Sequence, residues 1–193
     1  MTIVIYCVGI EDKGKIMISR IKFRNDVNKY WTELCEYVES YTALTGTGQD
    51  PSSAQANILR KVAKIGDIVK PVYGPMFAYD ITSNMQAMVS GLFEAVALIE
   101  NDIETDALTT RVVGNVIANL TQKLAAANSS WPSEVTTPIF VNIWNGWLDQ
   151  AKAKKANNVQ GYMEAKNLSM NNAIAFADAF VNGTIQIFES MFF

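Results

Sequence analysis

The chain has 193 residues, of which 49% are hydrophobic and 18% are charged, and its formal net charge is −3. This composition is too apolar for a disordered chain, and without a basic block it predicts no nucleic-acid partner. Because histidine is absent, Ser-His-Asp and Cys-His catalysis, His-ligated zinc and the Glu-x-x-His di-iron site are excluded. Carboxylate or lysine chemistry stays open, but no motif indicates it. We therefore predict no catalytic residue, no cofactor and no metal site.

The chain begins with the apolar stretch MTIVIYCVGI. A membrane span needs about 20 residues, and the stretch lacks the basic region and cleavage site of a signal peptide. We therefore expect no membrane span and a cytoplasmic location. Met17 resembles a natural start. Residues 1–16 are expected to be an N-terminal extension, with a short strand over 2–9 or disorder, ahead of a single domain over 17–193.

Apolar residues recur at intervals of three and four along the rest of the chain, which predicts an all-α protein. A first helix is expected over 25–45, and the following TGTG run ends it because glycine adopts the left-handed C′ conformation readily. A second helix is expected over 52–70, because Pro71 disfavours its continuation. Cys35 falls in the apolar pattern of the first helix and is predicted to be a core residue.

Four more helices follow in the pattern. They are expected from Pro75 or Asp80 to 100, and over 105–127, 138–150 and 158–191, and the loop before the helix at 138–150 carries Trp131. Long helices with short connections are typical of antiparallel bundles. Of the six expected helices, four long ones are predicted to form the core of an up-down bundle, with the shorter helix at 138–150 as an added element.

The stretch ILRKVAKIGDIVKPVYG, residues 58–74, combines an apolar stripe with charged residues. Gly66 lies on the stripe, and a mid-helix glycine usually has a packing reason, so we expect a neighbouring helix to approach closely there. Lys64 and Asp67 are expected on a solvated face. Tyr73 and Gly74 are expected to end the segment and turn the chain.

Three residues form a tentative polar or ligand site. Arg60 lies at the edge of the apolar stripe, and Asp178 flanks the apolar face of the last helix. If both turned inward they could pair, and the pair would fix helix register or bind an anionic group. Tyr73 is the third candidate.

The stretch at 58–74, the C-terminal ADAFVNGTIQIF and the NSSW loop resemble an uncharacterised family of small helical-bundle proteins from spore-forming and related bacteria. The matching positions are Arg60, Ile65, Gly66, Tyr73, Gly74, Trp131, Asp178, Gly183 and Phe188, with Trp31 as a further match. The resemblance implies the bundle architecture and no established activity. Members of that family carry histidines that this chain lacks. Either a metal site formed by those histidines is absent here, or the resemblance extends to the scaffold alone.

The composition and the motifs favour a non-catalytic bundle that acts through binding or assembly. The C-terminal TIQIFESMFF is expected to be an adhesive end for a partner or a second copy. The alternative is a small-molecule binding protein or enzyme for an anionic metabolite, with a pocket inside the bundle near Arg60, Tyr73 and Asp178.

Overall fold

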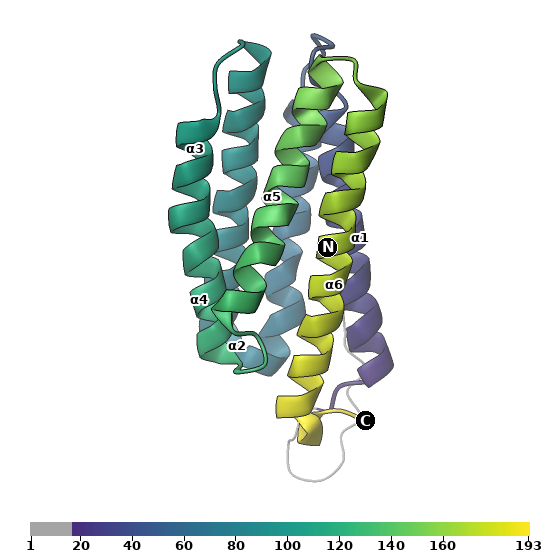
Figure 1. Ribbon diagram of the computed structural model, residues 1–193. Coiled ribbons are helices and arrows are strands. Elements are labelled where there is room, and N and C mark those ends of the chain that lie inside the picture. Colours follow the sequence, from purple (N-terminus) through teal and green to yellow (C-terminus); the bar gives the residue numbers. More distant parts are fainter. Residues whose placement is uncertain (1–16) are drawn as a thin grey trace.

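The computed structural model describes residues 17–193, and their regular structure is helical. The elements are α1 (Arg20–Thr42), α2 (Ser52–Glu100), α3 (Asp106–Arg111), the π-helix η1 (Val112–Ile117), α4 (Ala118–Ala127), α5 (Ser133–Lys155), α6 (Val159–Ile187) and the 3-10 turn η2 (Glu189–Met191). The prediction of an all-α bundle is confirmed (Figure 1). The expectations for residues 1–16 lie outside the described residues.

Helix α2 consists of two antiparallel arms joined at Gly74, whose backbone is non-helical with φ 82° and ψ 174°. A Cβ atom on Gly66 in the first arm would lie 2.8 Å from Thr82 Oγ1 and 3.6 Å from the Ala78 carbonyl oxygen in the second. The expected close contact at Gly66 and the turn at Gly74 are therefore confirmed. The first arm continues past Pro71, where we expected it to end, because Gly74 can adopt the positive φ that the turn needs.

The helices alternate in direction along the chain (Figure 1). α3, η1 and α4 follow one another without a break and form one long helix over 106–127. The connections therefore gather at two opposite ends. We name these the loop end, with connections 43–51, 101–105 and 156–158, and the hairpin end, with Gly74, connection 128–132 and residues 188–193.

Helix α5 is longer and more central than the short added helix expected at 138–150. It spans 23 residues and packs against α1, α2, α4 and α6. Trp144 and Trp147 are almost fully buried in it. Pro138 lies in its second turn, where it removes one backbone hydrogen bond, and three lysines in its last turn suit the negative end of the helix dipole. The arrangement of four core helices plus one is thus corrected, because α5 belongs to the core.

Aromatic side chains fill the middle of the bundle. Trp31 meets Phe176 edge to face with ring centroids 5.1 Å apart, and Phe140 meets Phe176 at 4.7 Å. A void of about 10 Å³ remains among these rings and the aliphatic residues around them. A void of this size holds one water molecule at most. Cys35 is buried, as predicted.

The C-terminal residues pack back onto the start of the bundle. The backbone N–H of Ile18 donates to Met191 O at 2.7 Å, and that of Phe193 donates to Ile18 O at 3.1 Å. Phe192 is buried against Phe23, with ring centroids 5.3 Å apart. Part of the expected adhesive end is therefore used inside the chain, while Phe193 stays 61% exposed.

Candidate functional site

Arg60 is exposed on the first arm of α2. Its guanidinium donates to the side-chain oxygen of Asn57 and, at 3.4 Å, to the carbonyl of Ala56. Both acceptors lie one turn earlier on the same helix. Arg60 therefore does not face the interior of the bundle.

Asp178 is also exposed and lies on α6. Its carboxylate lies 3.8 Å from Nη1 of Arg24 on α1, and Arg24 Nη2 donates to Asn182 Oδ1 at 2.8 Å. The pair between Arg60 and Asp178, which required both side chains to turn inward, is not formed. The structure separates these two candidates.

Tyr73 is the candidate that lies inside, at the hairpin end. Its hydroxyl lies 3.1 Å from Thr184 Oγ1 and accepts from Asn128 Nδ2 at 3.2 Å. Its ring packs against Trp131 and Phe188, with centroid distances of 5.6 and 4.9 Å. Burial raises the pKa of the Tyr73 hydroxyl, so the group stays protonated and links α2, α6 and the 128–132 connection.

Trp131 closes the same end. Its ring stacks on Phe180 at 4.5 Å, and its Nε1 donates to the Ala179 carbonyl at 3.1 Å. A Cβ atom on Gly183 would lie 2.5 Å from that nitrogen, so only glycine lets the indole lie flat on α6. Four positions that carried the family resemblance therefore meet in one structural cluster, at Tyr73, Trp131, Gly183 and Phe188.

The sequence interpretation missed the polar partners of this cluster. Asn128 is 2% exposed, and its side-chain oxygen accepts the backbone N–H of Ser130 at 2.8 Å. Thr184 is fully buried and also donates to the Phe180 carbonyl at 2.7 Å. Asparagine and threonine are common throughout helices and turns, so nothing in the local pattern distinguishes these two residues.

A charged pair between α1 and the first arm of α2 was also missed. Lys61 is 8% exposed, forms an ion pair with Glu33, and has its ammonium 5.5 Å from the centre of the Tyr30 ring. The hydrogen bond from Lys61 holds the pKa of the Glu33 carboxyl below its usual value. The pair joins two helices and leaves no free group for chemistry.

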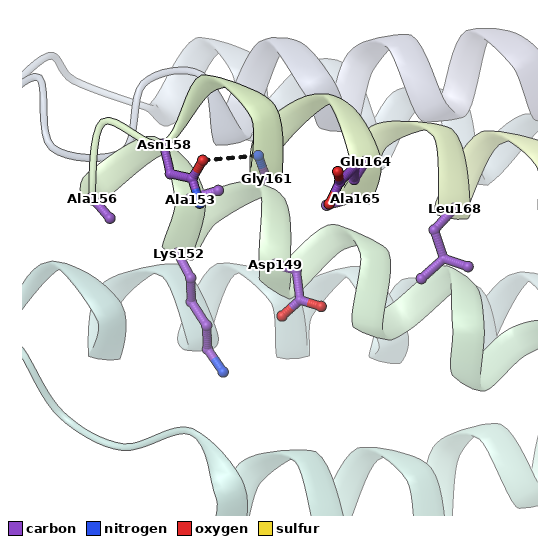
Figure 2. Close-up of a pocket in the computed structure, with 9 residues that line it drawn as sticks. All are labelled: Asp149, Lys152, Ala153, Ala156, Asn158, Gly161, Glu164, Ala165 and Leu168. Carbon is purple, nitrogen blue, oxygen red and sulfur yellow. Dashed lines mark hydrogen bonds between the residues drawn. The ribbon is translucent and has the colours of Figure 1, made fainter.

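A surface groove of about 490 Å³ lies between α5 and α6 near the loop end (Figure 2). Figure 2 shows Asp149 and Lys152 leaving the same side of α5, with Glu164 on α6. Asn158 accepts the backbone N–H of Gly161 at 2.9 Å and caps the start of α6. The lining carries both signs of charge above a floor of small side chains.

A second groove, which we name the α1–α2 groove, has a volume of about 350 Å³. It lies where the 43–51 connection crosses the ends of the two α2 arms. Tyr41, Phe93 and Val96 form its apolar part, and Thr45 and Glu100 are among its polar groups.

Residues 17–193 contain neither a candidate metal site nor a helix that could span a membrane. No three Cys, Asp or Glu side chains of this part of the chain lie together in a way that could hold a metal ion. None of its helices combines the length and the apolar character that crossing a membrane requires.

Comparison of the chain with protein-family models, with curated proteins and with solved structures found no match. The resemblance to the family of small bacterial bundles therefore stays a prediction. The fold and its clusters define the chain as an all-α, up-down helical bundle.

Proposed function

We propose that this is a non-catalytic helical-bundle protein that acts through binding or assembly, and that the hairpin end is its contact surface. The observation that carries the proposal is the exposure of Met76 and Tyr79, at 80% and 72%. Both lie directly after the Gly74 turn, in a stretch from Pro71 to Tyr79 that contains no charged residue. Large apolar side chains gathered at one surface mark contact sites.

Neighbouring elements add to this surface. Val135 at the start of α5 is 56% exposed, and Ile187 at the end of α6 is 45% exposed. Methionine adapts to irregular partners, and tyrosine combines a large apolar ring with a polar tip. These properties suit a surface that binds a protein partner or a second copy of the chain.

The filled interior supports a surface function over the alternative of an internal pocket. The void near the Trp31 and Phe176 rings is about 10 Å³, far below the 300 Å³ or so of a small-ligand site. Arg60 and Asp178, which were to line that pocket, are exposed. A cytoplasmic location and a bacterial origin belong to the proposal, and the free, buried thiol of Cys35 is compatible with a reducing compartment.

Light scattering coupled to size-exclusion chromatography tests assembly, over loading concentrations from about 10 to 500 µM, which cover weak self-association. The variant Met76→Ser/Tyr79→Ser removes the apolar groups of the hairpin end. The control Ile103→Ser/Val159→Ser removes two exposed apolar groups, 54% and 77% exposed, from the loop end.

We expect the mass of the unmodified chain and of the control to rise with concentration, while the hairpin-end variant stays monomeric. A monomer at every concentration, or an equal loss of association in both variants, would count against assembly through the hairpin end. Removal of residues 189–193 is a less suitable test, because Met191 and Phe193 hydrogen-bond to Ile18.

A further inference from the structure

We propose that the α1–α2 groove binds a small organic amine in its protonated form. The groove lies at the loop end, opposite the contact surface proposed above, so either proposal can fail without the other. Three features carry the inference: the size and apolar floor of the groove, the charge of its lining, and a buried hydroxyl group without a partner.

The groove has the dimensions of a small-ligand site. Its volume of about 350 Å³ falls within the range of roughly 300–1,000 Å³ that is usual for such sites. Tyr41 and Phe93 line it with rings in an edge-to-face arrangement, with centroids 5.1 Å apart, and Val96 adds an aliphatic surface. This floor suits a compact aromatic or aliphatic body.

The charge of the residues that line the groove indicates the sign of the charge on the ligand. Of the described residues that line the groove, Glu100 alone carries a charge. Its Oε1 accepts the backbone N–H of Gly46 at 2.5 Å, which holds the carboxylate at the rim. Aromatic faces also attract a cation, so the rings and Glu100 favour the same ligand.

The lysine that contacts the Glu100 backbone does not cancel this charge. Lys155 is not part of the lining, and its ammonium donates to Ile99 O at 2.5 Å, to Glu100 O at 3.2 Å and to Asp102 Oδ1 at 2.5 Å. Its three donors are thus used by two backbone carbonyls and one carboxylate. The Glu100 carboxylate has no cationic partner among the ion pairs of residues 17–193.

A buried hydroxyl group gives the second, independent indication of a ligand. Thr45 lines the groove and is 2% exposed, yet its Oγ1 has no hydrogen-bond partner in the described part of the chain. Leaving a buried polar group unpaired is unfavourable. Tyr41, whose hydroxyl accepts from Gln55 Nε2 at a long 3.4 Å, stays neutral because burial raises its pKa. An ammonium group supplies N–H donors for Glu100 and for the hydroxyl of Thr45.

Isothermal titration calorimetry of the full chain with three matched probe compounds tests the inference. The probes are phenethylamine, 2-phenylethanol and phenylacetate, which share one body and are cationic, neutral and anionic. For a nine-atom ligand we expect a Kd of about 1 mM for the amine. The alcohol should bind at least about fivefold more weakly, because a charge-assisted hydrogen bond is stronger than a neutral one, and the acid more weakly still.

Two variants connect the preference to the groove. Glu100→Gln keeps an oxygen for the Gly46 N–H but removes the charge, and it should lower amine affinity to that of the alcohol. The matched control Glu94→Gln removes a charge from an exposed carboxylate of the same arm that pairs with Arg111, outside the groove, and should leave binding unchanged. Circular dichroism checks that both variants are folded.

Each opposite result overturns the proposal. No binding of phenethylamine at about 20 mM, well above the expected Kd, excludes the site. Equal binding of the amine and the alcohol shows an apolar surface without selectivity for cations. An unchanged amine affinity in Glu100→Gln, or an equal loss in Glu94→Gln, shows that the cation binds elsewhere.

Discussion

Replacing Gly146 by alanine should destabilise the protein, although alanine is the better helix former. Gly146 lies in α5 against α6, and an added Cβ atom would meet Ala165 O at 2.8 Å, Ser169 Cβ at 2.8 Å and Ser169 N at 2.9 Å. Two of these three atoms belong to the backbone, so no side-chain rotation can relieve the contact. The two helices would have to move apart.

The net effect follows from two opposing contributions. Overpacking in a closely packed interface costs about 1–3 kcal/mol. Alanine gains up to about 1 kcal/mol over glycine within a helix. The hydrogen bond from Gln150 Nε2 to Ser169 Oγ, 3.0 Å long, crosses the same interface and would lengthen. We therefore expect a net loss of about 1–2 kcal/mol.

Gly114 offers a matched control with the opposite expected sign. It is exposed and helical, and an added Cβ atom would meet nothing within 4 Å. Gly114→Ala should therefore stabilise the protein by about 0.5–1 kcal/mol. Urea unfolding followed by circular dichroism measures the stability of both variants. In thermal unfolding, each kcal/mol of stability should shift the Tm by about 2–4 °C. Our reasoning is refuted if Gly146→Ala unfolds at the same or a higher urea concentration than the unmodified chain.

Three further predictions concern single side chains. Tyr73→Phe removes the hydroxyl that meets Asn128 and Thr184, and we expect thermal unfolding to show a loss of about 1–2 kcal/mol with the aromatic packing kept. The pKa of Glu33 is lower in the folded state than its usual value of 4.5. Its pairing with Lys61 therefore stabilises the protein fully above pH 4.5. That stability is lost as the pH falls through the lower pKa of the folded state. Glu33→Gln should therefore destabilise the protein at pH 7 and weaken the acid dependence below pH 4.5 in urea titrations, and an unchanged dependence would contradict this role. Burial raises the pKa of Cys35 to about 12, so in a Cys7→Ser variant a thiol reagent at about pH 8 should label Cys35 only after unfolding; labelling of the folded variant would show that the site opens.

The helices could be predicted from the sequence because apolar spacing directly reflects the buried face. The close contact at Gly66 could be predicted because this glycine lies on the apolar stripe, and the turn at Gly74 could be predicted because this glycine follows Pro71 and Tyr73 at the end of the segment. The length of α5 could not be predicted in this way. The expected range began at Pro138 and ended at 150, whereas α5 starts at Ser133, ends at Lys155 and buries Trp144 and Trp147.

The candidate site was harder to predict from the sequence, because a residue at the edge of an apolar stripe can face either the core or the solvent. The apolar side chain of Leu59 is 37% exposed, while the charged side chain of Lys61 is buried because Glu33 on another helix provides its partner. Arg60 follows Leu59 directly and is exposed with it. A pattern along one helix cannot predict which group a neighbouring helix supplies.

The hydrogen bonds between Ile18 and residues 191 and 193 also bear on how the chain is connected. They bring the ends of the described chain together, and α6 packs against both α5 and α1. The helices therefore follow one another in a closed circuit. A circular permutant, with 17 and 193 joined by a short linker and new ends opened in the 43–51 connection, would keep every helix beside its present neighbours. The contacts between neighbouring helices are therefore compatible with a chain that starts at a different point of the circuit.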